Sequence, residues 1–274
     1  MWKRFDPSRP FPVILGAVVA GILAGLVASV LLTFTAEPVI DRAITLEESH
    51  HAAEANAGVE PEIVSRTTQK GAGRFAAYGL GGAAYGGLFG IAFLLLRRRR
   101  RPAGSGDGRA DSADAAFRPA LLAGALLAGA FTVMPFLKYP PNPPGVGDPA
   151  TLSERQWKYL ALIFLSLVIL AGAARLSGHL RARGWTDDER LAAVGLAVVV
   201  PLGLLCAALP PFHDPVDVPA NLLWRFRIAS LGGNLLLWSV LTVTFGTAAV
   251  RRERALAAPA PAPGAGAFRP ATTP

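Results

Sequence analysis

Imidazole and carboxylate side chains gather in one short segment that prolines enclose. Residues 210–219 read PPFHDPVDVP, which places His213, Asp214 and Asp217 within five residues. Nitrogen and oxygen ligands of this kind suit a borderline divalent transition metal. Proline fixes φ and restricts the residue before it, so the segment is a stiff turn and not a helix or a central strand. The pattern predicts a point of metal capture. The alternative is structural, with Asp217 capping the helix that follows.

A second segment is built in a similar way and also connects two apolar stretches. Residues 138–149 read KYPPNPPGVGDP. Asn142 and Asp148 could add oxygen ligands to the same metal, although Asp148 could instead cap its downstream helix. Ordinary connections between membrane helices do not need so many prolines. Function is therefore expected at these two segments, here named the first Pro-rich loop (138–149) and the second Pro-rich loop (210–219).

Histidines and glutamates also share one face of a predicted helix over residues 40–57. Glu47, His50, His51 and Glu54 fall at positions i, i+3, i+4 and i+7 of that helix. This spacing suits a second site for a divalent metal. A solvated amphipathic helix that lies at the membrane surface would show the same pattern, so both interpretations stay open.

Sulfur and amide groups within apolar segments are candidates for a metal pathway. Met134 and Cys206 each lie four residues before the outer end of an apolar segment, counted to Lys138 and Pro210. Asn234 is the most polar residue deep inside another segment. Methionine and cysteine are also ordinary residues of a membrane core. No aspartate, glutamate or lysine lies in the middle of an apolar segment, so the buried carboxylates of proton-driven pumps are missing.

The elements that must position these residues are membrane spans. The chain has 274 residues, of which 52% are hydrophobic and 17% charged. A span needs about 20 apolar residues. Six segments qualify, and Lys158, at the start of the fourth, is the only charged residue in them; they are 11–34, 75–96, 119–137, 157–174, 191–209 and 228–250. The predicted fold is an all-α polytopic membrane domain over 1–254, with six helices arranged as three in–out–in hairpins.

The distribution of positive charge predicts the orientation of these spans. With both termini inside, segments 1–10, 97–118, 175–190 and 251–274 face the cytoplasm and hold 18 of the 27 lysines and arginines. Both Pro-rich loops and segment 35–74 then lie outside. By composition, 97–118 is expected to be a flexible loop and 255–274 a disordered Ala/Pro-rich tail. The excess positive charge fits anionic lipid, and no nucleic-acid partner is needed.

Small residues recur at every fourth position in the first three spans. They form one face of each: Ala17, Gly21 and Gly25, then Gly82, Gly86 and Gly90, then Ala120, Gly124 and Ala128. Such faces allow close helix packing in lipid. They predict either a tightly packed bundle or an interface that holds a homo-oligomer or a partner helix.

The two Pro-rich loops carry a family resemblance. The run YPPNPPGVGDP from Tyr139, and the run PFHDPVDVPANLLWRFR from Pro211, resemble the CbtA family of proposed bacterial cobalt transporter subunits. The resemblance extends from the first span to the sixth. It implies uptake of Co²⁺ as a substrate, with no tightly bound cofactor, and a link to cobalamin synthesis. It also implies the bacterial inner membrane and a small single-span, His-rich partner, CbtB.

Two classes of function remain after these observations. The first is the membrane subunit of an uptake system for a divalent transition metal, with cobalt expected. The second is a membrane scaffold that does not transport, whose outer Pro-rich loops bind a partner protein. An enzyme is not expected, because neither a catalytic triad or dyad nor zinc-hydrolase spacing is present. The chain also lacks the phosphate-binding motif of ATPases.

The predicted orientation can be tested with cysteines on the two sides. We expect Ser105→Cys to be shielded from a membrane-impermeant thiol reagent in intact cells, because five arginines at 97–101 resist translocation. Ala150→Cys, beside the first Pro-rich loop, should be labelled. The native Cys206 is first replaced by serine. Labelling at position 105 in intact cells would contradict the six-span topology.

Overall fold

The computed structural model describes residues 10–53, 65–98, 111–144, 146, 149–212 and 218–257. Every regular element within these ranges is a helix, as the sequence predicts. The α-helices are α1 (Pro10–Thr35), α2 (Glu37–Ala53), α3 (Arg66–Thr68), α4 (Arg74–Arg98), α5 (Asp111–Ala128), α6 (Met134–Lys138), α7 (Leu152–Ala182), α8 (Asp187–Ala208) and α9 (Ala220–Ala257). Two short π-helices, η1 (Gln69–Gly73) and η2 (Gly129–Val133), and one 3-10 helix, η3 (Pro149–Thr151), complete them.

Six helical stretches of the described chain are long and apolar enough to cross a membrane, which confirms the six predicted spans. They are Pro10–Thr35, Arg66–Arg97, Phe117–Lys138, Leu152–Ala182, Asp187–Ala208 and Ala220–Ala255. The fourth, the shortest by prediction, belongs to the long helix α7. The helix α5 begins at Asp111, inside the segment expected to be a flexible loop. Residues 99–110 of that loop and 258–274 of the expected tail lie outside the described residues.

The first two spans pack backbone against backbone. A methyl group added at Gly21 of α1 would meet the carbonyl group of Gly82 in α4, and one at Gly86 would meet that of Ala17. The predicted glycine faces are therefore close-packing faces, and they pack against each other within one chain. These two faces are consequently filled, and they cannot hold an oligomer together. That part of the sequence interpretation needs correction.

A central core forms where α9 lies against α1 and α5. Trp238 of α9 is 2% exposed, and its indole Nε1 donates a hydrogen bond of 3.0 Å to Thr132 Oγ1 in η2. Phe245 of α9 packs edge-on against Phe89 and Phe93 of α4. The third small-residue face also points here, since a methyl group at Gly124 would collide with Thr242 of α9. The helices α1, α4, α5 and α9 thus form one bundle.

The third span changes its geometry at Pro135. The π-helix η2 lies just before this residue and separates α5 from α6. A proline inside a helix removes one hydrogen bond, and its ring collides with the carbonyl group four residues earlier, which belongs to Phe131 in η2. A wider π turn accommodates both effects. The α5 part of the span packs mainly on α9, whereas η2 and α6 contact α7.

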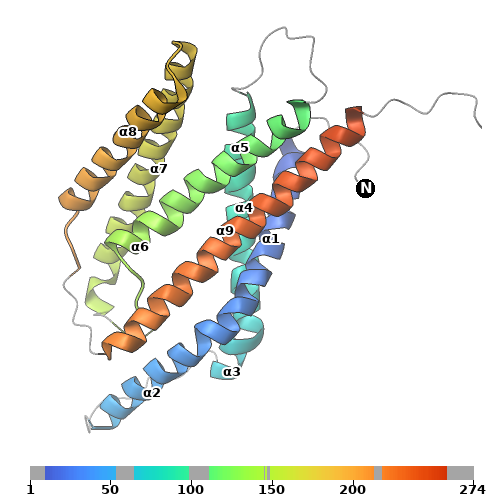
Figure 1. Cartoon of the computed structure of the whole chain (residues 1–274). Coiled ribbons are helices and arrows are strands. Elements are labelled where there is room, and N and C mark those ends of the chain that lie inside the picture. The colour runs from blue at the N-terminus through green and yellow to red at the C-terminus, as the bar shows by residue number, and fades with distance from the viewer. Residues whose placement is uncertain are drawn as a thin grey trace, which may run out of the picture.

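The helices α7 and α8 form a separate pair beside this bundle. They pack on each other, and α7 reaches the bundle mainly through η2 and α6 (Figure 1). The consecutive spans α8 and α9 therefore have different packing partners, although chain order had suggested a hairpin. Figure 1 also shows the start of α1 and the end of α9 at one end of the molecule. We name that end the inner end, and the end with the Pro-rich loops the outer end; which side faces the cytoplasm remains a prediction.

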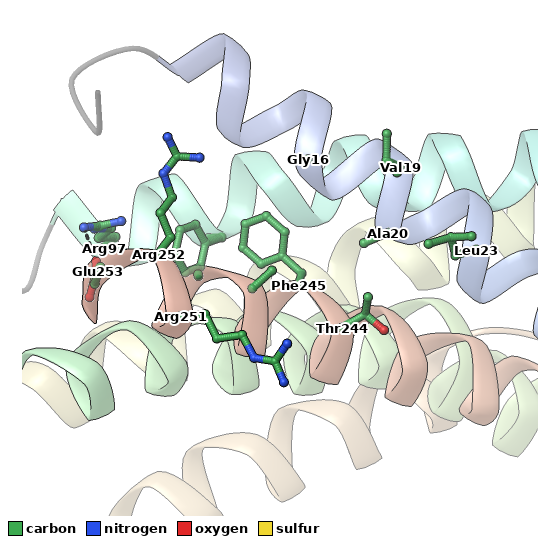
Figure 2. Close-up of a pocket in the computed structure, with 13 residues that line it drawn as sticks. Gly16, Val19, Ala20, Leu23, Arg97, Thr244, Phe245, Arg251, Arg252 and Glu253 are labelled. Carbon is green, nitrogen blue, oxygen red and sulfur yellow. Dashed lines mark hydrogen bonds and ion pairs between the residues drawn. The ribbon is translucent and has the colours of Figure 1, made fainter. Parts of the chain in front are cut away.

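An ion pair ties two helices of the bundle at the inner end. Arg97 of α4 donates through Nη2 to Glu253 Oε1 of α9 (Figure 2). The guanidinium of Arg97 also lies 5.9 Å from the centre of the Phe93 ring. A pocket of about 420 Å³ opens beside this pair, between α1 and α9. The last turns of α4 and α9 are thereby held together.

The glycine contact predicts a specific effect on stability. We expect Gly86→Leu to destabilise the protein by roughly 1–3 kcal/mol or more, because the side chain forces α1 and α4 apart. Gly81→Leu is the matched control, since a methyl group at Gly81 meets nothing within 4 Å. Thermal unfolding followed by size-exclusion chromatography in mild detergent measures both. Equal melting temperatures for the two variants would refute the proposed close contact.

Candidate functional site

The two Pro-rich loops meet at the outer end of the molecule. The rings of Tyr139 and Phe212 stack with their centres 4.2 Å apart and their planes 19° from parallel. The hydroxyl group of Tyr139 donates a hydrogen bond of 2.8 Å to the carbonyl oxygen of Pro210. Burial raises the pKa of Tyr139, so its hydroxyl group stays protonated and remains a donor. One tyrosine therefore joins the first loop to the second.

The helix that follows the second loop fastens the first loop. Arg227 of α9 donates through Nη2 to Asn142 Oδ1 at 2.9 Å and through Nε to the carbonyl oxygen of Pro141 at 3.3 Å. A planar guanidinium can make two such bonds at once, which fixes the loop in position and in orientation. Between Lys138, which ends α6, and Pro149, which begins η3, the described residues of the first loop are not helical, and neither are the described residues of the second loop, 210–212 and 218–219.

Positive charge surrounds this junction. Lys138 lies 5.7 Å from the centre of the Tyr139 ring, and Lys158 lies 5.6 Å from the centre of the Phe212 ring. Lys158 also forms an ion pair of 2.5 Å with Glu154 in the first turn of α7. A pocket of about 550 Å³ lies between the first loop, the start of α7 and Phe212. A metal cation near this pocket would need carboxylates to offset the lysines and Arg227.

The helix α2 docks beside the second Pro-rich loop. Val39 and Ala43 of α2 form a buried cluster with Leu222 of α9, and Val218 packs against it from the end of the loop. Both described ends of the second loop are thus anchored, Phe212 on the first loop and Val218 on α2. The helix α2, from the segment that the sequence placed on the same side as the Pro-rich loops, therefore packs against the second loop.

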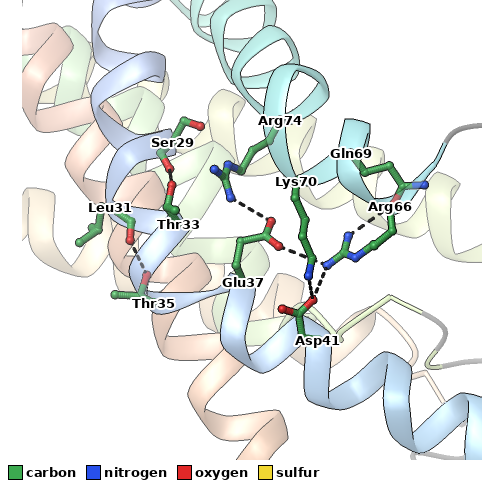
Figure 3. A network of polar contacts seen from close by, with 10 residues as sticks. All are labelled: Ser29, Leu31, Thr33, Thr35, Glu37, Asp41, Arg66, Gln69, Lys70 and Arg74. Atoms are coloured by element: carbon green, nitrogen blue, oxygen red, sulfur yellow. Dashed lines mark hydrogen bonds and ion pairs between the residues drawn. The ribbon is translucent and has the colours of Figure 1, made fainter.

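A charged network holds α2 against the start of the second span (Figure 3). Glu37 accepts from Arg74 at 3.0 Å and from Arg66 at 3.2 Å. Asp41 forms ion pairs with Lys70 at 2.6 Å and with Arg66 at 3.2 Å. The hydrogen bond from Lys70 lowers the pKa of Asp41 below its usual range, so this carboxylate stays ionised at neutral pH. The network fixes where α2 leaves the membrane domain.

Most of the predicted metal ligands have side chains outside the described part of the structure. Among the described residues, no three or more His, Cys, Asp and Glu side chains converge on a point that could hold a metal ion. The backbone of Glu47, His50 and His51 belongs to α2, but their side chains are not described. The remaining predicted ligands besides Asn142 lie outside the described residues altogether: Glu54, Asp148, His213, Asp214 and Asp217.

The two sulfur residues lie in one apolar cluster near the loop junction. Met134 is buried together with Tyr139 and Leu162, and Cys206 packs against this cluster. The sequence had placed the two sulfurs at matching depths, and the structure brings them to one place from the third and fifth spans. Asn234 lies elsewhere, on α9, where its amide donates to the carbonyl oxygen of Ser230 at 2.9 Å.

Comparison with known families identifies one that spans most of the chain. The profile of CbtA, described as a probable cobalt transporter subunit, matches residues 12–250. The chain belongs to the CbtA family. No curated protein and no solved structure matches the chain. The matched range includes both Pro-rich loops, α2 and nearly all of the six spans, so the site at the outer end belongs to the part of the chain that CbtA proteins share.

Membership in CbtA supports several of the expectations drawn from sequence. The family description supports a multi-pass membrane subunit in cobalt transport, with Co²⁺ as substrate and with at least one further subunit. It names a transporter subunit, as the sequence led us to expect. The residues that assemble the outer end, Tyr139, Phe212 and Arg227, were absent from the candidate ligands. Two signals pointed to them: aromatic residues beside prolines, and arginines at the outer end of the sixth span.

The role of Arg227 in this CbtA protein can be tested directly. We expect Arg227→Gln to loosen the first Pro-rich loop, because two bonds from one guanidinium are lost. Amide hydrogen exchange of peptides covering 138–152 should rise severalfold. Arg225→Gln is the control, because Arg225 is exposed on the same helix and its substitution removes the same charge. If the control accelerates exchange equally, the effect comes from general charge and not from the bonds to Pro141 and Asn142.

Proposed function

We propose that this protein is the membrane subunit of an uptake system for a divalent transition metal, cobalt, and that the metal enters at the joined Pro-rich loops. The observation that carries the proposal is the stack of Tyr139 on Phe212 beside the cluster that holds Met134 and Cys206. It supports a single mouth built from both loops, with two soft sulfur groups near it. The CbtA family description supplies the substrate.

Capture of the hydrated cation is assigned to the second Pro-rich loop. His213, Asp214 and Asp217 are among the five residues between Phe212 and Val218. Phe212 stacks on the first loop and Val218 packs on α2, so both ends of this short segment are fixed. Imidazole and two carboxylates can replace part of the water shell of the ion. The carboxylates also offset the lysines and Arg227 around the junction.

The first Pro-rich loop supplies secondary oxygen ligands in this proposal. Asp148 adds a third carboxylate. Asn142 Oδ1 already accepts a hydrogen bond from Arg227, and its second lone pair is available to a metal. A cation bound there would repel the neighbouring guanidinium of Arg227 and so weaken the attachment of the first loop to α9.

Two further groups complete the proposed path. Glu47, His50, His51 and Glu54 on and after α2 form an accessory site that concentrates metal near the mouth, since α2 docks against the end of the second loop. Met134 and Cys206 provide the next, softer contacts. Asn234 lies on the same path only if the ion passes along α9.

The driving force and the biological setting come from outside this chain. We infer a single-span, His-rich CbtB-like subunit as partner, uptake that feeds cobalamin synthesis, and location in the bacterial inner membrane. The absence of aspartate, glutamate and lysine from the middle of the spans supports energy coupling through another subunit.

One observation favours the alternative function, a scaffold that binds a partner protein. The junction of the loops is largely aromatic and proline-rich, with Tyr139, Phe212, Pro140 and Pro141 lining its pocket. Surfaces of this composition also bind peptides. The two functions differ in the expected effect of the ligand residues, because a scaffold does not need an imidazole or ionised carboxylates.

Uptake of radiolabelled Co²⁺ separates the two functions. We expect His213→Ala and Asp214→Asn each to lower uptake by roughly tenfold in cells that also express the presumed partner, with protein levels unchanged. His179→Ala is the control, because it removes a histidine from the last turn of α7 at the other end of the molecule. Wild-type uptake by both loop variants would leave the scaffold function as the better explanation.

The same assay has an expected pH dependence. A metal binds neutral imidazole, so uptake should fall as the pH drops below the ordinary histidine pKa of about 6.5. The His213→Ala variant should have lost this fall, and its residual uptake should vary little between pH 7.5 and 6. A pH profile equal to that of the wild type would exclude His213 as the titrating ligand.

A further inference from the structure

A deep cleft separates the α7/α8 pair from the bundle at the inner end. Its volume is about 980 Å³, and its walls come from α5, α7 and α8 with one residue of α4. This cleft lies far from the Pro-rich loops, because Arg118, Arg181 and Arg190 on its rim are at the inner ends of their helices. The metal path proposed above does not use it.

The cleft exists because the α7/α8 pair touches the bundle mainly in its outer half. There, η2 and α6 contact α7, whereas α5 has few contacts with it. From that point α5 and the pair diverge toward the inner end (Figure 1). Within the described chain, α8 packs mainly on α7, and Leu191 and Leu196 in its inner half are 74% and 66% exposed. In a bilayer, such a wedge-shaped space must be filled by apolar matter.

Among the described residues, four arginines line the cleft and no aspartate or glutamate does. They are Arg118 of α5, Arg175 and Arg181 of α7, and Arg190 of α8. Arg190 forms an ion pair of 2.8 Å with Asp187. Within the described part of the chain, the other three have no ion pair. The smaller pocket in Figure 2 differs here, since its Arg97 is paired with Glu253 inside the lining.

The arginines lie at more than one depth. Arg175 precedes Arg181 by six residues, so the two lie about 9 Å apart along the helix axis. Below them the walls are apolar, with Leu121 and Leu126 on one side and Val194 and Val198 on the other. An occupant must therefore combine negative charge at the rim with a long apolar body. A soluble anion meets only the first requirement.

We propose that this cleft binds an anionic phospholipid, with its phosphate among the arginines and its acyl chains between α5 and the α7/α8 pair. A guanidinium binds phosphate oxygens with two parallel hydrogen bonds, which favours arginine over lysine at such a site. Basic pockets between membrane helices are known to hold anionic head groups in this way. The bound lipid would then set the angle between the pair and the bundle.

The test compares lipid binding by the full-length protein and two charge variants. Delipidated protein in mild detergent is incubated with phosphatidylglycerol or with phosphatidylcholine of the same acyl chains, and bound lipid is counted by native mass spectrometry. The wild type should retain phosphatidylglycerol at least tenfold better than phosphatidylcholine. The double variant Arg175→Gln with Arg181→Gln should lose most of this preference, by roughly tenfold. Both side chains are exposed, so folding should survive.

A matched control distinguishes the cleft from the general charge of the inner end. Arg183→Gln with Arg254→Gln also removes two exposed arginines there, but neither residue lines the cleft. This control should keep the preference of the wild type. An equal loss in both double variants, or equal binding of the two lipids by the wild type, would overturn the proposal. So would displacement of the lipid by millimolar glycerol phosphate, because the site would then recognise a soluble anion.

Discussion

The close approach of α1 and α4 is the contact on which the remaining structure depends. In water, burial of apolar side chains would hold two helices together, but lipid is as apolar as leucine and gives no such drive. The two helices instead bring their backbones together where glycine leaves no side chain, at Gly21, Gly82 and Gly86. Dispersion contacts along both backbones replace the hydrophobic effect. A larger residue at these positions would push α1 and α4 apart and so disturb the surface of α1 against which α9 packs.

The outer end is assembled on that base by a series of local contacts. The helix α9 crosses α1 and carries Arg227, which holds the first Pro-rich loop through Asn142. The first loop holds the second through Tyr139, and the second loop continues into α9. The contacts therefore form a closed ring, in which α9 begins and ends the sequence of attachments. Release of one member loosens both loops together, which makes the mouth a single mechanical unit.

The sequence predicted the membrane-spanning helices better than it predicted which helices pack against one another. Six apolar stretches of sufficient length can hardly be anything but spans, because the thickness of the bilayer sets a strict length. Four-residue spacing revealed the glycine faces, but nothing in the spacing says whether Gly86 meets another copy or α1. Proline content showed that the loops are stiff. The bond from Arg227 to Asn142 joins residues 85 positions apart, and no local pattern reports such a distance.

The same limit applies to the candidate metal site. Residue types predicted imidazole and carboxylate groups on one side of the membrane, and the structure gathers the loops and α2 that carry them. The separation of α8 from α9 could not be foreseen, because both spans are apolar on all sides and so present no distinct face. When a helix is apolar on all sides, the helix that packs against it is selected by the fit of side-chain shapes, and the hydrophobic pattern of the sequence does not show this fit.

The wide turn η2 gives the third span two separate tasks. One additional residue in a helical turn rotates everything beyond it by about 100° about the helix axis. Because of this offset, the inner half of the span presents Gly124 to α9, while the outer half presents Met134 to the cluster that α7 shares. In a regular α-helix the directions of both residues would follow from a single rotation of about 100° per residue. The turn η2 thus rotates the outer half of the span relative to its inner half. Deletion of one residue between 129 and 133 would remove this rotation and turn the outer half toward different neighbours, although no candidate ligand would be replaced.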